Sequence, residues 1–315
     1  VKVIKCDTAS YHEFGEVVGN IEVVKGRVEI AESAKVAAVV VTGGGVKVDV
    51  KNPEVKVNVK EGVTAEVTGV EQTSVKIVST YDELKAALTN GGSIFLGDDI
   101  QSTEQLKVDG KVSLTIDLNG YTISGRATSK PLIYVKGKLT INGQGKITSG
   151  STGYSLIYVC DYEGSRGELT VNGGTVKSTS ETPLIINGTT GAGDSKGGVV
   201  TINGGEFIAK KFCIGTIREG EVTINGGTFT SMDNAVIGTL GTEGKGKNKI
   251  TINGGVFNGY IESPDAIACG VYLANDDTLT VNGGTFNIYN GIGILVRSGK
   301  ATIGKDVTIN LYNSE

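Results

Sequence analysis

Tryptophan is absent from this sequence, and its 315 residues include one histidine, one methionine and four prolines. Long apolar runs are also missing: the longest candidate, residues 36–41, is far shorter than the roughly 18 residues that a membrane-spanning helix needs. The formal net charge of −4 comes from 30 basic and 34 acidic residues that are interspersed along the chain. Because no basic patch stands out, we expect neither nucleic acid binding nor insertion into a membrane.

Clusters of cysteine and histidine are missing as well. The cysteines Cys6, Cys160, Cys213 and Cys269 lie far apart in the sequence, and the only histidine is His12. A structural zinc site needs four close ligands, so we expect no metal, and nothing in the sequence indicates a cofactor. We interpret the cysteines as small buried hydrophobic residues. A disulfide between Cys213 and Cys269 stays open and would require the fold to align them.

Glycine, in contrast, is abundant, and much of it belongs to a repeated phrase. The 48 glycines are about twice the usual share of roughly 7%. The phrase Leu-Thr-Val-Asn-Gly-Gly-Thr-Val begins at Leu169, and close copies occupy 200–207, 222–229, 250–257 and 279–286. Shorter copies precede and follow them, so that the phrase returns every 22 to 31 residues. Repeats at this spacing predict a solenoid, and the shortest spacing fits one coil of three short strands and three turns.

Each repeat can be interpreted as part of one coil. In Leu-Thr-Ile the outer residues should point inward and the threonine outward, because strand side chains alternate. The expected outward row is Thr115, Thr140, Thr170, Thr201, Thr223, Thr251, Thr280 and Thr302. We interpret it as a solvated sheet; a hydroxyl surface for ice or crystalline polysaccharide is the alternative.

The second half of the repeat predicts a corner and an aromatic stack. Asn-Gly-Gly suits a corner because asparagine and glycine tolerate positive φ, and stacked asparagines can bond along the axis. We count Asn119 as the corner asparagine of the first repeat, which places it in the same row as Asn142. The phenylalanines that follow the corners should stack inside the solenoid. They are Phe207, Phe229, Phe257 and Phe286.

Residues 1–78 have a different sequence pattern, because apolar and polar residues alternate strictly at 46–50, 55–59 and 63–67. This alternation predicts strands of a small β module or a narrower coil. Thr80 to Glu83 fit a capping box, and 84–88 form one apolar helical face that could cover the first coil of the solenoid. We therefore expect an N-terminal docking or anchoring module at 1–78 and a solenoid at 79–315.

The segments 81–85, 92–96 and 117–124, together with the Asn-Gly turns, resemble the opening of the pectate-lyase-like right-handed parallel β-helix proteins. The resemblance covers 79–315 and is strongest to the non-catalytic members found in phage virion fibres and bacterial surface proteins. It implies an all-β fold: a right-handed parallel β-helix with a short N-terminal capping helix and a separate small N-terminal β module.

The predicted third strand of each coil is apolar without alternation, as expected where both faces are covered. We therefore expect this face to pack against another subunit, with a homotrimer favoured, or against the N-terminal module. The candidate oligomer face comprises Ile133, Tyr134, Ile157, Tyr158, Ile185, Ile237, Tyr272 and Leu295.

Most variation in connection length falls after this third strand. Insertions on one edge of a repeat array often build a binding surface, although plain tolerated loops are the alternative. The candidate binding residues in these loops are Asp161, Tyr162, Glu163, Arg166, Asp194, Lys196, Lys245 and Lys247.

Catalytic residues are not evident. The carboxylate pairs at 98–99 and 276–277 have no companion acids one coil away, and no histidine lies in the predicted solenoid. We expect a non-catalytic structural or attachment protein, a rigid fibre or decoration subunit that could bind a glycan or host surface. The alternative is a secreted polysaccharide lyase or glycoside hydrolase, which would require a carboxylate and cation cluster outside one sheet.

The setting stays open between a virion surface and an extracellular or cell surface. Residue 1 is valine, which fits a removed signal peptide and equally a trimmed initiator methionine. Cysteines without evident partners favour synthesis without export, and hence the virion. A capsid or surface protein is then the expected docking partner of residues 1–78.

Overall fold

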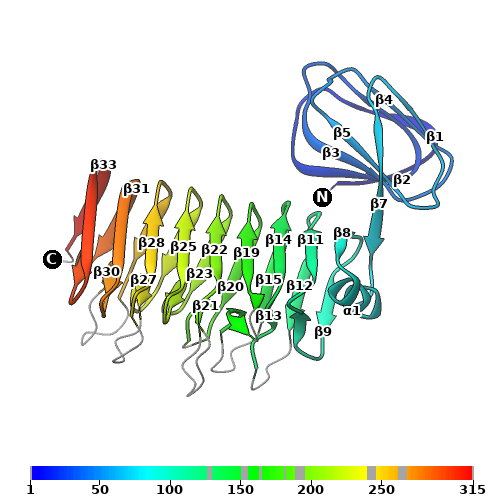
Figure 1. Ribbon diagram of the computed structural model, residues 1–315. Coiled ribbons are helices and arrows are strands. Elements are labelled where there is room, and N and C mark those ends of the chain that lie inside the picture. Colours follow the sequence, from blue (N-terminus) through cyan, green and yellow to red (C-terminus); the bar gives the residue numbers. More distant parts are fainter. Residues whose placement is uncertain are drawn as a thin grey trace.

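The computed structural model describes residues 2–125, 130–149, 155–162, 165–180, 182–188, 196–239, 246–261 and 268–313, with the backbone alone for 2–9 and 162. The chain forms two parallel solenoids joined by one strand, and the larger of them is a parallel β-helix (Figure 1). The fold class expected for residues 79–315 is therefore confirmed.

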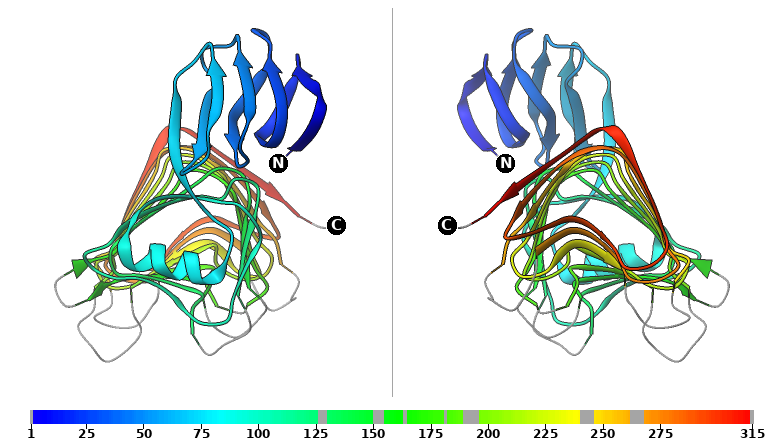
Figure 2. Two further views of the ribbon diagram at one scale, coloured as in Figure 1. Left: turned by 90° about the vertical axis from the view of Figure 1, so that its right-hand side faces the viewer. Right: turned by 90° about the vertical axis from the view of Figure 1, so that its left-hand side faces the viewer.

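Three sheets run along the β-helix and give it a triangular cross-section (Figure 2). The first sheet contains β8 (Gly92–Leu96), β11 (Ser113–Asp117), β14 (Lys138–Asn142), β19 (Glu168–Val171), β22 (Val199–Ile202), β25 (Glu221–Ile224) and β28 (Lys249–Ile252). The second contains β9 (Ile100–Ser102), β12 (Thr122–Gly125), β15 (Lys146–Ser149), β20 (Thr175–Ser178), β23 (Glu206–Ala209), β26 (Thr228–Ser231) and β29 (Val256–Gly259). The long strands β31 (Thr278–Tyr289) and β33 (Lys300–Tyr312) bend from the first sheet into the second.

The third sheet contains β10 (Leu106–Val108), β13 (Ile133–Val135), β16 (Ile157–Val159), β21 (Ile185–Asn187), β24 (Ile214–Thr216), β27 (Ala235–Thr239), β30 (Ala268–Leu273) and β32 (Gly291–Val296). A two-stranded ribbon, β17 (Asp161–Tyr162) and β18 (Ser165–Arg166), lies beyond β16. It belongs to the edge where the third sheet turns into the first.

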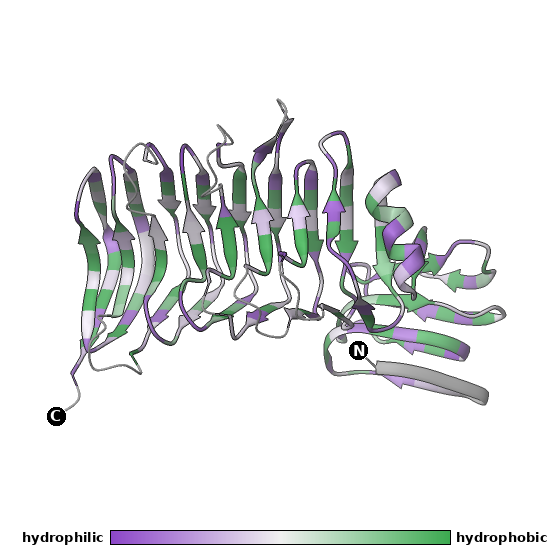
Figure 3. Ribbon diagram, turned by 90° about the horizontal axis from the view of Figure 1, so that it is seen from below, coloured by the Kyte–Doolittle hydropathy of each residue, from purple (hydrophilic) through white to green (hydrophobic). Residues whose placement is uncertain are grey.

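The register of the first sheet follows the repeat. All eight expected threonines pair in one row, from Thr115 through Thr140 to Thr302, and their neighbours Leu139 and Ile141 are buried. In Figure 3 the hydrophobic bands continue across neighbouring strands. The alternation predicted for one coil is thus confirmed.

The asparagines at the corners form the expected ladder. From Asn282 to Asn142, each Nδ2 donates to the Oδ1 of the asparagine one coil earlier, at 2.7 Å in all five bonds. Asn119 is not part of this row, because Asp117 takes the position beside Asn142. The φ of 47° at Asn119 turns its amide inward, where Nδ2 donates to Leu96 O.

The phenylalanines form the expected internal stack. Neighbouring ring centroids from Phe207 to Phe286 lie 4.7, 5.0 and 4.6 Å apart, with the rings nearly parallel. All four side chains have no exposed surface. They fill the interior of four successive coils.

Helix α1 (Tyr81–Asn90) lies across the first coil, as Figure 2 shows in the view from that end. The capping box is present in full: the Thr80 side chain accepts from Glu83 N, and the Glu83 carboxylate accepts from Thr80 N. Leu84, Ala87 and Leu88 are buried against the coil, and Gly91 ends the helix with a φ of 74°. The helix therefore closes the N-terminal end of the apolar core, as expected.

The N-terminal solenoid is a narrower coil and not a separate sandwich. Its strands are β1 (Lys2–Glu13), β2 (Glu16–Ile30), β3 (Lys35–Val41), β4 (Val46–Val50), β5 (Lys56–Lys60), β6 (Ala65–Thr68) and β7 (Gln72–Val78). All pair in parallel, and alternate valines fill a core of their own. Strand β7 pairs with β5 through its first half and with β8 through its second half, so the boundary expected near residue 79 lies where this shared strand ends.

Side chains also connect the two solenoids. Asn20 Nδ2 donates to Asn119 Oδ1 at 2.7 Å, and the Tyr121 hydroxyl donates to the Glu22 carboxylate. Asn20 and Asn119 are both buried, so this bond is shielded from water. The inward turn of Asn119 thus serves the junction between the solenoids.

Cys160, Cys213 and Cys269 are buried free thiols. The open possibility of a Cys213–Cys269 disulfide is wrong, because the register places Ala235 beside Cys269 while Cys213 N bonds to Val236 O. Burial raises the pKa of Cys213 and raises that of Cys269 to about 11.

We expect these thiols to resist alkylation in the folded chain. At pH 8 both remain in the protonated form, which is a poor nucleophile, and they are out of contact with solvent. Iodoacetamide treatment followed by peptide mass mapping should leave Cys213 and Cys269 unmodified in buffer and modified in urea. Rapid modification of either residue in the folded protein would contradict this packing.

Candidate functional site

The outward face of the third sheet differs from the sequence-based expectation. Ile133, Ile157, Ile185 and Ile237, which were expected on an oligomer face, are at most 2% exposed and fill the chain's own core. The other four expected residues, Tyr134, Tyr158, Tyr272 and Leu295, do lie in the outward row, together with Ile186, Gly215 and Gly238. Alternation along the strand explains the difference, since only every second residue of the apolar run can face outward.

The chain itself covers the middle of that outward row. A Cβ placed on Gly215 would lie 2.9 Å from Pro183 Cγ, and one on Gly238 would lie 2.5 Å from Phe212 Cε1. Pro183 and Phe212 belong to the turns that lead from the second sheet to the third. At β24 and β27 the chain's own turns therefore cover the outward side of the strand.

A charged hollow lies along the edge between the third and first sheets. It encloses about 420 Å³ and is lined by Asp161, Arg166, Lys196, Gly197, Glu219, Glu221, Lys247 and Lys249. We call it the charged trough. Its residues come from four successive turns of the β-helix, and each turn reaches this edge directly after the third sheet.

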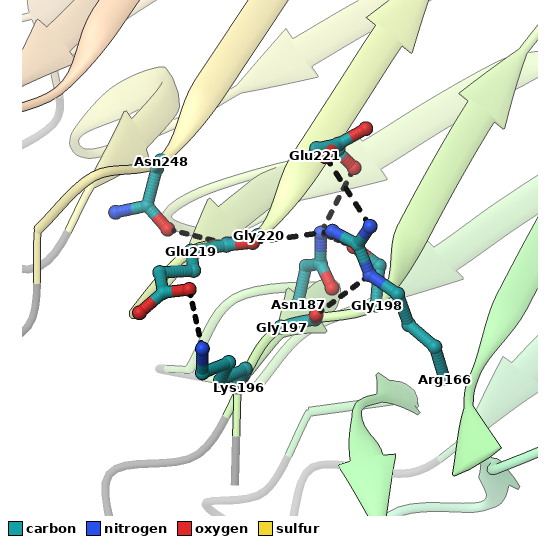
Figure 4. A network of polar contacts seen from close by, with 9 residues as sticks. All are labelled: Arg166, Asn187, Lys196, Gly197, Gly198, Glu219, Gly220, Glu221 and Asn248. Atoms are coloured by element: carbon teal, nitrogen blue, oxygen red, sulfur yellow. Dashed lines mark hydrogen bonds and ion pairs between the residues drawn. The ribbon is translucent and has the colours of Figure 1, made fainter. Parts of the chain in front are cut away.

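Arg166 spans the trough (Figure 4). Its Nη1 lies 3.2 Å from Glu221 Oε1, Nη2 donates to Glu219 O at 3.2 Å, and Nε donates to Gly197 O at 3.4 Å. Glu221 stands two coils after the coil of Arg166, as the strand register shows. One side chain therefore ties three coils together along the axis.

A second ion pair narrows the trough, because Lys196 Nζ lies 2.7 Å from Glu219 Oε2. The hydrogen bond from Lys196 lowers the pKa of the Glu219 carboxyl, and the charges of Lys247 and Arg166 act in the same direction. Arg218, Glu219 and Lys247 adopt φ values of 51°, 60° and 65°. Three left-handed residues that are not glycine within one site indicate backbone geometry held in place by its surroundings.

The floor of the trough is a buried polar network. Asn248 Oδ1 accepts from Gly220 N at 3.0 Å and from Thr216 Oγ1 at 3.3 Å, while its Nδ2 donates to Asp277 Oδ1 at 2.8 Å. Asn187 Nδ2 donates to the carbonyls of Gly198 and Glu221. These bonds fix the turn at Glu219 and Gly220 from beneath, so the charged groups above are held on a rigid base.

A smaller hollow of about 230 Å³ continues the trough toward the C-terminal coils. It shares Glu219 and Lys247 with the trough and adds Arg218, Gly246, Asn275 and Asp276. The carboxylate pair at 276–277 is thus divided: Asp276 lines this hollow, while Asp277 is buried in the floor network. The second carboxylate pair of the sequence, at 98–99, has a local role. Asp98 caps its own turn, and Asp99 accepts a hydrogen bond from Thr122 N.

Four of the predicted loop residues meet in the trough: Asp161, Arg166, Lys196 and Lys247. The other four predicted residues lie outside the described part of the structure: the side chain of Tyr162, and the whole of Glu163, Asp194 and Lys245. Sequence reasoning missed Glu219, Glu221 and Lys249. Aligning the residue before each Leu-Thr-Ile would have found Glu221 and Lys249, because they hold the same strand position in neighbouring coils.

A larger hollow of about 680 Å³ lies at the junction of the two solenoids. Asn20, Asn58, Phe95 and Asp117 are among its lining residues, and burial raises the pKa of the Asp117 carboxyl. Its walls are the facing surfaces of the two solenoids, and Asn20 already bonds across them. We therefore interpret it as the seam between the solenoids.

Among the residues that the structure describes, no group of three or more histidine, cysteine, aspartate or glutamate residues could hold a metal ion. No helix in the described part of the chain is long and apolar enough to cross a membrane. Comparisons of the chain with protein-family models, with curated proteins and with solved structures find no match.

Proposed function

We propose that this chain is a non-catalytic attachment protein, a rigid β-helical rod that binds an anionic surface polymer through the charged trough. In this proposal the rod stands on a phage virion or a bacterial surface. The N-terminal solenoid docks to a capsid or surface protein and points the β-helix outward. The polymer is a glycan that carries carboxylate groups.

The observation that carries the proposal is the pair Lys247 and Lys249 at the mouth of the trough. The two lysines flank the buried Asn248, and both are exposed and line the trough. Within the described ranges neither has an ion-pair partner, whereas Arg166 and Lys196 are held by glutamates. Two exposed ammonium groups beside a polar trough suit the carboxylates of a uronate polymer.

The rigidity of the site supports binding over catalysis. A general acid needs a raised pKa, but Lys196 lowers the pKa of Glu219, and Arg166 holds Glu221 in an ion pair. Both carboxylates are therefore engaged in fixing the trough. A preorganised site of this kind loses little side-chain freedom when a polymer binds.

Reversing the charge at both lysines tests the proposal. The variant with Lys247→Glu and Lys249→Glu should bind polygalacturonate about tenfold more weakly, because two attractive contacts become repulsive. Biolayer interferometry at low salt measures this loss, and the fully methyl-esterified polymer should bind neither protein. Lys146→Glu, an exposed change on β15 away from the trough, is the matched control. Equal binding by the double variant and the wild type would refute the proposal.

A polysaccharide lyase or hydrolase is the second candidate, and a specific observation favours it. The trough brings Asp161, Glu219 and Glu221 beside Arg166 and Lys196, which is the carboxylate and cation cluster expected of such an enzyme. Prolonged incubation with polygalacturonate, followed by assays for reducing ends and unsaturated uronates, distinguishes the two candidates. Product that depends on Glu219 would favour the enzyme.

A further inference from the structure

Among the residues that the structure describes, nothing covers the apolar core at the last coil of the β-helix. Ile303, Ile309 and Leu311 of β33 pair in register with Val281, Phe286 and Ile288 of β31. The three residues of β31 have no exposed surface, whereas those of β33 are 46%, 42% and 57% exposed. The third sheet ends in the same way, with Ile292 and Val296 of β32 exposed. In Figure 2 no helix or strand of the described part of the chain lies over this end.

The two ends of the β-helix are unlike. Helix α1 packs Leu84, Ala87 and Leu88 over the first coil, and the N-terminal solenoid adjoins the same end. The C-terminal end of another molecule could not stack there, so head-to-tail growth is blocked. An exposed, apolar edge strand the length of β33 is nevertheless a strong template for pairing.

The backbone of β33 shows which groups face this free edge. Asn290 N donates to Tyr312 O, so the N–H and C=O of Tyr312 point back toward β31. Residues alternate along a strand, and the N–H and C=O of Ile309 therefore point toward the free edge. Two antiparallel copies of β33 could exchange both of these bonds at Ile309.

We infer that two copies of this chain pair tail to tail about a two-fold axis through Ile309. This register is self-complementary: Ile309 faces itself, and Val307 faces Leu311 of the second copy. On the outer surface Thr308 faces Asn310 of the second copy, and Asp306 faces Tyr312 of the second copy. Apolar residues meet inside and polar residues meet outside from residue 306 to residue 312.

A second asparagine row, on the second sheet, runs from Asn258 through Asn287 to Asn310, and its end fits this arrangement. Asn310 Nδ2 donates to Asn287 Oδ1 at 2.9 Å, which leaves Asn310 Oδ1 as the acceptor next to the free edge. The hydroxyl of Thr308 in the second copy is a donor for it. Tyr312, whose ring stacks on Tyr289, carries a hydroxyl that can donate to the Asp306 carboxylate of the second copy.

The other two sheets also match under this axis. A two-fold axis perpendicular to the long axis of the β-helix brings the second sheets of the two copies together. It also places the first sheet of each copy against the third sheet of the other copy. Ala301 and Ile303 then face Ile292, Ile294 and Val296 of the second copy, and all of these side chains continue the apolar interior. The result is one closed rod with an N-terminal solenoid at each outer end.

Light scattering during size-exclusion chromatography tests this inference. The wild-type chain should elute with twice its mass of 32.6 kDa. Ile309→Lys should elute at the single-chain mass, because two lysines would meet on the axis. Ile309→Glu should do the same, and an equimolar mixture of the two variants should recover the doubled mass. Val256→Lys, which removes an exposed apolar residue of β29 away from the free edge, should leave the dimer intact.

Circular dichroism would establish that each variant is folded. A wild-type chain that is monomeric at every concentration, a trimer, or open-ended aggregates would each overturn the inference. So would a dimer that persists in both Ile309 variants, or a failure of their mixture to recover the doubled mass. These outcomes concern the C-terminal end alone and are separate from binding at the trough.

Discussion

Replacing Phe229 with alanine should lower the free energy of unfolding by about 3–5 kcal/mol, one of the largest effects expected for a single substitution in this chain. Phe229 is fully buried and stacks between Phe207 and Phe257, at 4.7 and 5.0 Å. The loss combines the transfer of an aromatic ring to water with a cavity that opens into the coils above and below. Urea denaturation followed by circular dichroism measures it.

Phe14→Ala is the matched control, because Phe14 is 66% exposed on the N-terminal solenoid. Its effect should stay within about 0.5 kcal/mol, as for most surface substitutions. Equal losses for the two variants would show that the internal stack does not stabilise the β-helix. A separate early transition in the Phe229 variant would show that the two solenoids unfold independently.

Replacing Asn248 with alanine should cost about 2–4 kcal/mol, since it leaves the buried N–H of Gly220 and the hydroxyl of Thr216 without their acceptor. It also removes one of the donors to the buried carboxylate of Asp277. The turn that holds Glu219 should loosen, so binding at the trough should weaken together with stability. Denaturation and binding measurements on the same preparation check both effects.

Asn225→Ala provides the comparison, because Asn225 belongs to the outer asparagine ladder and is exposed. Water can replace its side-chain bonds, so we expect a loss of less than about 1 kcal/mol and unchanged binding. If Asn248→Ala were as mild as Asn225→Ala, the floor network would not be what holds the trough.

The scaffold could be predicted from the sequence because each of its features repeats. The threonine row, the asparagine ladder and the phenylalanine stack each depend on one strand position seen in many coils. Asn119 was misplaced because its local Asn-Gly resembles the repeat, whereas its amide turns inward to Leu96 and Asn20. The contact with Asn20 depends on the N-terminal solenoid, whose sequence lies outside the repeat.

The third sheet shows the limit of pattern reasoning. Its unbroken apolar runs predicted two covered faces, but they did not indicate that Pro183 and Phe212 of the same chain cover part of the outward face. In the trough, Arg166 and Lys196 were found because their loops are long. Glu219 was missed because it lies in a short turn, and its meeting with Lys196 follows from how the coils stack.

A crystal structure of the chain with a polygalacturonate oligosaccharide would test the central claim most directly. The account predicts an uncleaved oligosaccharide along the charged trough, with carboxylates beside Lys247 and Lys249 and with the Arg166–Glu221 ion pair intact. An oligosaccharide bound elsewhere on the β-helix, or cleaved within the trough beside Glu219, would contradict a non-catalytic attachment role for this site.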